Sequence, residues 1–477
     1  MFDIEEASIH CLQAAMNKGE VSSRDLTLAY MERISKYDKS GPKLNSVLEI
    51  NPDALFIADA MDCERSTIGV RGQLHGIPVL LKDNINTRDK MHTSAGSIAL
   101  SDSYAPYDAY LVGKLRAAGA VILGKANMTE FANFMTEGMP NGYSSRGGQV
   151  LNPYNAARDP SGSSSGSAVA VSANLCAAAL GTETRGSIMG PAYMNGIVGI
   201  KPTVGLVSRS GIIPISNSQD TAGPMARTVE DAAIMLGAIA CMDEMDPATW
   251  ASRDRAYADY TQFLDKDGLQ GARIGINEGY IGNFTEDELK VINTAKSVMK
   301  ENKAVLVYGI GLPNTGGKSS VSLYEFKQSI NAYLSSLGPG APVHSLREII
   351  NFNNQHPEEA LKYGQKTLMR AELETSGTLS EPAYIMSKIN DIRISQTEGI
   401  DRVIDENKLD ALFCPGITDI AAVAGYPSIM VPAGFTSDGM PFGVTFIGKA
   451  YSEPMLLKIA YAFEQAAKAR AKPGSIG

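Results

Sequence analysis

Apolar side chains recur at two different spacings along this chain of 477 residues, and the change of spacing divides the chain into segments. Residues 3–37 place them at helical spacing, and Ser22 with Asp25 three positions later forms a capping-box start, so two amphipathic helices are predicted there. From about 70 to 230, short continuous apolar runs alternate with helical patterns, as in a sheet whose strands are buried on both faces. The clearest runs predict strands at 76–81 and 120–124 and a helix at 108–119.

The middle and the end of the chain have different patterns. Residues 242–270 and 345–400 are more polar and predict helices, with strands predicted at 272–276 and 304–308 between them. The last part returns to short apolar runs followed by an amphipathic helix, with elements predicted at 409–416, 428–434, 442–448 and 455–470. This alternation predicts the α/β class, with a central mixed β-sheet covered on both faces by helices.

Composition narrows the range of partners. A hydrophobic content of 44% and a net charge of −9 are typical of a globular protein and argue against nucleic acid or an anionic membrane as a partner. The apolar runs are shorter than the 18 or more residues that a bilayer crossing needs, and the acidic start of the chain does not resemble a signal peptide. We therefore expect a cytoplasmic protein.

Cysteine and histidine residues are scattered. The five cysteines form no CxxC pair and are expected to be reduced and mostly buried, and the five histidines show no spacing typical of a metal site. A nucleophilic cysteine is a weak alternative. We expect catalysis, if present, to need no metal, nucleotide or organic cofactor.

Three polar features interrupt the apolar core in a pattern that could carry chemistry. Lys82 ends a fully apolar strand, where a lysine is costly unless it is paired or neutral. The Gly/Ser run 162–167 leads into an apolar helix, and the turn 181–187 ends in Ser187 at the start of another helical stretch. A serine at such a turn can be flanked by backbone N–H groups, as an oxyanion hole requires. Each feature alone is more often structural than catalytic, so serine–lysine catalysis is one interpretation among several.

A competing pattern lies inside the Gly/Ser run. Residues 162–166 satisfy the GxSxG pattern of an α/β-hydrolase nucleophile, with Ser164 at its centre. That mechanism needs an acid and a histidine further along the chain, and the only later histidines, His344 and His356, lie in the polar helical region. The pattern is also common by chance in a chain rich in Gly and Ser, so this alternative is disfavoured.

A set of longer motifs stands in order along the chain. The motifs are GIPVLLKDN (76–84), LGKANMTEF (123–131), PSGSSSGSAVAV (160–171), GTETRGSIMGPA (181–192), GIVGIKPTVGLVSRSGIIP (196–214), SQDTAGPMARTVEDAA (218–233), GYPSIMVPAGF (425–435) and FGVTFIG (442–448). Together they resemble the amidase signature family, and the resemblance covers most of the chain apart from about 240–400. The motifs around Ser187 and at 218–225 look closest to those of peptide amidases and aryl acylamidases.

The resemblance implies a catalytic triad of two serines and a lysine. By motif, Lys82 matches the family's base, Ser163 the bridging serine that follows a cis peptide bond, and Ser187 the nucleophile. It also implies an oxyanion hole built from backbone amides, here those of Thr184, Arg185, Gly186 and Ser187. A lysine acts as a base only when it is neutral, so burial without a carboxylate partner must lower the pKa of Lys82 from about 10.4 toward neutrality. Asp83 is adjacent, but on a strand it would point to the opposite face.

The resemblance also implies the organisation of the chain. We expect one domain over residues 1–477, with an N-terminal helical segment at 1–60 and a signature core at about 70–235. A variable helical region at about 240–400 is expected to form a wall of the pocket.

The turn at the nucleophile departs from the common family wording in three places. Glu183 stands where many members have Asp, Arg185 where Gly is usual and Met189 where Arg is usual. Backbone amides can still form the hole if φ of Arg185 stays negative. The departures therefore affect the expected substrate more than the expected mechanism.

These observations predict an amidase that breaks a C–N amide bond through an acyl-enzyme on Ser187. The leading substrate is a small carboxamide or an aryl acylamide (anilide), with a peptide carrying a C-terminal amide as the alternative within the same chemistry. Two other classes are kept: a protein like the glutamine-using component of an amidotransferase, which feeds ammonia to a partner, and a non-catalytic binding protein. We expect a monomer or homodimer that acts on a small-molecule amide, without nucleic acid or membrane.

Overall fold

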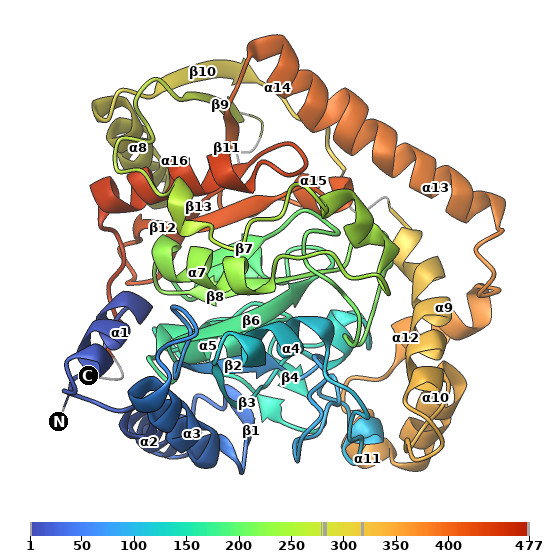
Figure 1. Cartoon of the computed structure of the whole chain (residues 1–477). Coiled ribbons are helices and arrows are strands. Elements are labelled where there is room, and N and C mark those ends of the chain that lie inside the picture. The colour runs from blue at the N-terminus through green and yellow to red at the C-terminus, as the bar shows by residue number, and fades with distance from the viewer. Residues whose placement is uncertain (1, 278, 280–283, 316–318, 475–477) are drawn as a thin grey trace.

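The computed structural model describes residues 2–277, 279, 284–315 and 319–474, and the central feature of these residues is a large mixed sheet (Figure 1). Within the described ranges the sheet has eleven strands in the order β1–β3–β2–β6–β8–β7–β12–β13–β11–β9–β10. A separate two-stranded ribbon pairs β4 (Tyr143–Ser144) with β5 (Gly148–Gln149). The strands of the main sheet are β1 (Val47–Ile50), β2 (Pro78–Lys82), β3 (Val121–Ala126), β6 (Ala178–Glu183), β7 (Val198–Lys201), β8 (Thr221–Ala226), β9 (Arg273–Asn277), β10 (Val305–Ile310), β11 (Ala411–Pro415), β12 (Ser428–Phe435) and β13 (Pro441–Ile447).

The sheet mixes parallel and antiparallel pairs. Strand β2 runs parallel to β3 and β6, and β9 runs parallel to β10 and β11, whereas the strands between these two groups pair antiparallel. Every residue of β2, β3, β6, β11 and β13 is buried, as expected for continuous apolar runs covered on both sides. The predicted α/β class with a helix-flanked mixed sheet is confirmed.

Helices pack around the sheet and beside it. The predicted capping box at Ser22 and Asp25 is present, because the Ser22 side chain accepts from the N–H of Asp25 and the Asp25 side chain accepts from the N–H of Ser22.

The helices are α1 (Ile9–Asn17), α2 (Ser23–Arg33), α3 (Ala54–Thr67), α4 (Tyr110–Ala117), α5 (Ser165–Ser172), α6 (Met189–Met194), α7 (Val229–Ile239), α8 (Glu286–Glu301), α9 (Val321–Ser336), α10 (Leu346–Gln355), α11 (Pro357–Ala360), α12 (Lys366–Glu374), α13 (Pro382–Ile392), α14 (Asp401–Asn407), α15 (Ile420–Ala424) and α16 (Glu453–Ala467). None of the helices in the described ranges combines the length and the apolar character that a bilayer crossing requires.

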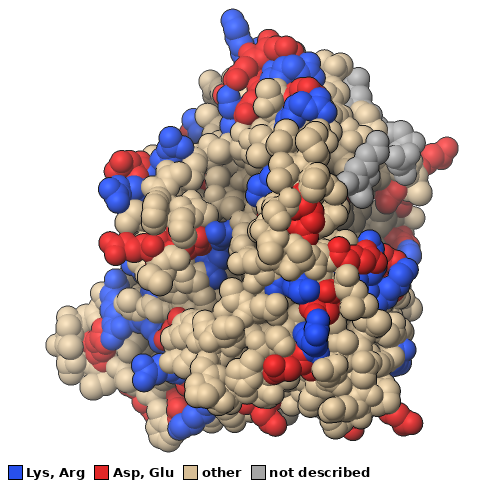
Figure 2. Space-filling view, turned by 90° about the vertical axis from the view of Figure 1, so that its right-hand side faces the viewer, with Lys and Arg blue, Asp and Glu red and all other residues tan. Residues whose placement is uncertain are grey.

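A second apolar core lies beside the sheet, where α9, α10 and α12 pack against the segment around residues 95–135. Phe326 and Ile330 of α9 are fully buried in it, together with Met128. Figure 1 shows these helices standing to the right of the sheet, with α13 running along the outer edge. Figure 2 views the molecule from this side and shows a hollowed face on which most atoms around the hollow belong to uncharged residues.

The expectation that residues 242–270 are helical is wrong. This segment contains only two short 3-10 turns, η4 (Pro247–Ser252) and η5 (Thr261–Phe263). Its aspartates accept from backbone N–H groups two residues further on, which stabilises local turns in competition with a helix. These bonds run from Met245 to Asp243, from Ala248 to Asp246, from Thr261 to Asp259 and from Asp267 to Asp265.

Candidate active site

Lys82 lies at the end of β2 and is completely buried. Its Nζ donates to the Oγ of Ser163 at 2.8 Å, to the Oγ of Ser164 at 3.0 Å and to the carbonyl oxygen of Thr182 at 3.1 Å. Because β6 is the parallel neighbour of β2, the lysine reaches across to the end of β6 and to the residues that precede α5. The structure therefore brings together two of the residues that the family resemblance selected.

The charge state of Lys82 follows from its surroundings. Burial lowers the pKa of Lys82 from its ordinary value of 10.5 to about 7, against the smaller opposing effect of the carboxylates of Glu183 and Asp220. The adjacent Asp83 faces away, as expected for a strand, and accepts from the N–H of Gly96 while it pairs with Arg146. A substantial fraction of Lys82 is therefore neutral near pH 7.

Ser163 follows a cis peptide bond between Gly162 and Ser163. A side chain at position 162 would collide with Thr129 Oγ1 and with Asn141 Oδ1, so the close approach requires glycine. The carbonyl oxygen of Ser163 accepts from the N–H of Thr129 at 3.1 Å. The close packing of Gly162 and the hydrogen bond to Thr129 therefore fix the backbone that positions the Ser163 hydroxyl against Lys82.

Ser187 lies in the turn between β6 and α6, and only 6% of its surface is exposed. The carboxylate of Glu183 closes this turn, because its Oε2 accepts from the N–H of Ile188 at 2.6 Å and from the N–H of Met189 at 3.0 Å. The carbonyl oxygen of Ser187 accepts from the N–H of Ser164 at 3.2 Å, which joins this turn to the segment that carries the other two serines. The position of Glu183 thus explains why an acidic residue stands there.

Asp220 supports the same turn from the loop before β8, a role that the sequence pattern did not indicate although the residue lies in a quoted motif. Its carboxylate accepts from Thr184 Oγ1 at 2.5 Å and from the N–H groups of Ile215 at 2.7 Å and Ser216 at 2.8 Å. Burial raises the pKa of Asp220, and these hydrogen bonds oppose that rise. The backbone amides at 184–187 are therefore fixed from both sides.

The backbone of Arg185 does not adopt a positive φ, which is the condition for its N–H group to contribute to the oxyanion hole. The positive backbone angle in this turn belongs to Gly186, with φ of +71°, and Arg185 is not among the residues with positive φ. Its half-buried side chain extends toward α9, where Nη2 lies 3.3 Å from the Oγ of Ser322.

The α/β-hydrolase alternative has no support in the geometry. The Oγ of Ser164 is buried and occupied, since it accepts from Lys82 and from the N–H of Thr182 and donates to the carbonyl oxygen of Thr182. His344 is exposed beside Glu348, and His356 stacks on the ring of Phe352. In the part of the chain that the structure describes, no group of three or more His, Cys, Asp or Glu side chains is arranged to hold a metal.

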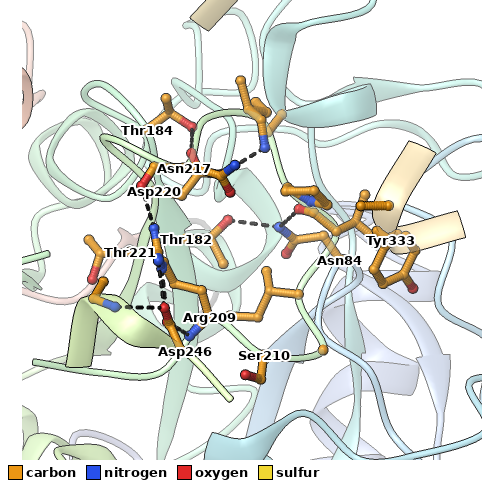
Figure 3. Close-up of a pocket in the computed structure, with 18 of the residues that line it drawn as sticks. Asn84, Thr182, Thr184, Arg209, Ser210, Asn217, Asp220, Thr221, Asp246 and Tyr333 are labelled. Carbon is orange, nitrogen blue, oxygen red and sulfur yellow. Dashed lines mark hydrogen bonds and ion pairs between the residues drawn. The ribbon is translucent and has the colours of Figure 1, made fainter. Parts of the chain in front are cut away.

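A cavity of about 860 Å³ adjoins the nucleophile turn. Thr182, Glu183 and Thr184 form part of its wall, and Figure 3 shows Asn84 bonded to Thr182 opposite Arg209, which pairs with Asp246. The 240–400 region contributes a further part of the wall, from residues 245–248 and from Ala332, Tyr333 and Ser336 of α9.

The family of the chain follows from this site and from comparison with known proteins. The model of the family described as Amidase matches residues 25–457, so the chain belongs to the amidase family, whose members are hydrolases that act on C–N bonds. A probable amidase from Arabidopsis thaliana is 43% identical over 99% of this chain and 92% of its own length. The structure of native peptide amidase from Stenotrophomonas maltophilia is similar with a TM-score of 0.93 and 47% identity, covering 99% of each chain. A glutamyl-tRNA(Gln) amidotransferase component from Caldanaerobacter subterraneus is 32% identical over 100% of this chain and 99% of its own.

Proposed function

We propose that this protein is a serine amidase that releases ammonia from peptides carrying a C-terminal amide, with Ser187 as nucleophile, Ser163 as proton relay and Lys82 as base. The observation that carries the proposal is the buried Lys82 Nζ, which lies 2.8 Å from Ser163 Oγ and has its pKa lowered to about 7. A base of this pKa accepts protons efficiently at neutral pH. Backbone amides of Thr184, Arg185, Gly186 and Ser187 form the proposed oxyanion hole.

The first half of the reaction transfers the acyl group to the enzyme. Ser187 Oγ attacks the amide carbonyl while its proton passes to Ser163, whose own proton passes to neutral Lys82. The carbonyl oxygen becomes an oxyanion that accepts from the backbone amides of the turn. The C–N bond then breaks as the lysine returns a proton through Ser163 to the leaving nitrogen, which departs as ammonia.

The second half hydrolyses the acyl-enzyme. A water molecule gives its proton to the same Ser163–Lys82 relay and attacks the ester carbonyl. The bond to Ser187 Oγ breaks, the serine regains the proton and the carboxylic acid is released. The atoms balance without a metal or an organic cofactor.

The substrate class rests on similarity. The likeness to the Stenotrophomonas maltophilia peptide amidase extends over 99% of each chain at 47% identity, so we place peptide amides ahead of the anilides that the sequence motifs favoured first. Anilides and small carboxamides remain the second candidate within the same chemistry. The relative named as an amidotransferase component keeps glutamine hydrolysis with a partner protein as a third candidate.

The organisation is proposed to be a single domain over residues 1–477, with the helical region 240–400 as a pocket wall. The seven cavity-lining residues between 245 and 336 support this view. Residues 278, 280–283 and 316–318 of that region lie outside the residues that the structure describes. A cytoplasmic location and a monomeric or homodimeric state stay predictions.

A panel of amides tests the proposed function. Purified protein is given peptide amides, anilides, small carboxamides and free glutamine, with ammonia or amine release measured for each. The proposal expects the highest kcat/KM for peptide amides and loss of all activity in Ser187→Ala. Activity confined to anilides would favour the second candidate, and glutamine hydrolysis that a partner protein stimulates would favour the third.

A further inference from the structure

The guanidinium of Arg185 has unused hydrogen-bonding capacity beside the nucleophile turn. An arginine side chain carries five N–H donors in a planar fork. Among the described residues, the hydrogen bond of this guanidinium is the one to Ser322 Oγ at 3.3 Å, and its charge acts on the Asp391 carboxylate without an ion pair within 4 Å. Such a group next to an active site can bind a ligand without first giving up a strong partner.

The carboxylates near Arg185 are each held by other donors. Glu183 accepts the two N–H groups at the start of α6, and Asp220 accepts Thr184 and two N–H groups. Asp391 accepts from Ser319 Oγ at 2.5 Å. None of these three acids is hydrogen-bonded to the guanidinium, although the charge of Arg185 lowers the pKa of Asp391 against the rise that burial causes.

Glu325 of α9 is the fourth acid in this neighbourhood and is also fully engaged. It is almost completely buried and accepts from Ser216 Oγ at 2.5 Å, from the N–H of Ser218 at 3.0 Å and from Tyr384 at 2.8 Å, and it pairs with Lys388 at 3.3 Å. Its charge is consequently compensated within the protein.

Arg209 shows the contrast, because it lines the neighbouring cavity but is saturated. Its guanidinium forms a bidentate pair with Asp246, with Nη2 at 2.5 Å and Nε at 2.9 Å, and Nη1 donates to the carbonyl oxygen of Asn217. Of the two arginines around the nucleophile turn and its cavity, Arg185 is thus the one with donors to spare.

The part of the substrate that the protein can recognise lies on the acyl side of the amide bond that breaks. When ammonia is the leaving group, only the acyl part can be read by the protein. The main chain of Arg185 belongs to the proposed oxyanion hole, so its side chain starts beside the carbonyl under attack. A guanidinium in this position matches the bidentate geometry of a carboxylate.

We propose that Arg185 selects peptide amides that carry an acidic side chain, Asp or Glu, at the amidated residue or the one before it. The inference rests on the proposed function and names its substrate class. On the face that Figure 2 shows, most atoms around the hollow belong to uncharged residues, with a few Lys, Arg, Asp and Glu side chains at its rim.

The test compares substrates that differ only in charge. Blocked dipeptide amides with Glu, Gln or Lys at either position are assayed for ammonia release by wild type, Arg185→Met and Arg185→Glu. Glu and Gln are matched in shape, so their ratio of kcat/KM isolates the charge. We expect wild type to prefer Glu, Arg185→Met to lower the Glu-to-Gln ratio about tenfold or more, and Arg185→Glu to shift the preference toward Lys.

Ser322→Ala is the matched control, because it removes the hydrogen-bond partner of the guanidinium and keeps its charge. It is expected to retain the Glu preference, which should also weaken as ionic strength rises. A wild-type Glu-to-Gln ratio near one, or an equal loss for all three substrates in both Arg185 variants, overturns the inference while leaving the proposed function intact. A wild type that releases no ammonia from any peptide amide overturns the proposed function, and the inference falls with it.

Discussion

Replacing Lys82 by Met should abolish activity and yet make the protein more stable at neutral pH. The side chains are similar in length, but Met needs no water around it, whereas the fully buried ammonium does. In the folded protein Lys82 loses its proton near pH 7, and in the unfolded chain it keeps the proton to about its ordinary value of 10.5. Between these two values unfolding takes up a proton, so the stability of wild type rises with pH across this window and is lowest at and below pH 7.

The size of the effect follows from that window. A difference of roughly three pH units at about 1.4 kcal/mol each means that Lys82 lowers the stability of the folded state at pH 7 by about 4 kcal/mol. Removing its hydrogen bonds costs about 1–2 kcal/mol, mainly at Ser163, because Ser164 and the carbonyl oxygen of Thr182 stay bonded to each other. Lys82→Met should therefore raise the free energy of unfolding at pH 7 by about 2–3 kcal/mol.

Urea unfolding of both proteins at pH 7 and pH 9.5 measures this difference. Two other buried lysines, Lys125 and Lys201, have their pKa values lowered to about 8, but they are present in both proteins and cancel in the comparison. The stability advantage of the variant should shrink as pH rises, because wild type gains stability toward pH 10.5. A variant that is less stable than wild type at pH 7, or an advantage that does not change with pH, would refute the reasoning about the neutral lysine.

The remaining predictions concern activity and local stability. For wild type, kcat/KM should rise about tenfold per pH unit below about 7, where Lys82 is protonated, and level off above it; a profile flat from pH 5 to 8 would contradict a lysine base. Ser163→Ala should lower kcat/KM about a thousandfold, and Ser164→Ala should lower it by less than about tenfold, since Ser164 is not in the relay; the reverse order would reject the assignment. Glu183→Gln should lower kcat about tenfold with little change in KM, because the carboxylate accepts from two N–H groups of the nucleophile turn, and an effect on KM alone would contradict this role. Ser22→Ala should cost about 1 kcal/mol of unfolding free energy in a thermal melt without altering kcat/KM, because its side-chain bonds stay within the capping box of α2.

Strands were the most predictable part of the fold. The runs at 76–81, 120–124 and 409–416 correspond to β2, β3 and β11, because strands buried on both faces must be apolar throughout. The local turns of residues 242–270 could not be predicted from the pattern of apolar and polar residues. Their aspartates satisfy backbone groups in local turns, and the pattern of polar residues alone does not distinguish such turns from an exposed helix.

The residues of the candidate active site also differ in how far the sequence predicts them. Spacing alone left Lys82 and Ser187 as ordinary strand-end and turn residues, and the family motifs selected them together with Ser163. The contact of Arg185 with Ser322 joins residues 137 positions apart, so no local pattern could reveal it. Glu183 departs from the common family motif, and its closure of the turn depends on N–H groups that only the folded backbone brings to its carboxylate.

Trapping the acyl-enzyme tests the central claim most directly. A slowly hydrolysed amide or ester is mixed with the protein, the reaction is quenched in acid during turnover, and the protein is digested and analysed by mass spectrometry. The acyl mass should be found on Ser187, and Ser187→Ala should carry no adduct. An adduct on Ser164 or on a cysteine, or turnover without any adduct on Ser187, would contradict the assignment of Ser187 as the nucleophile.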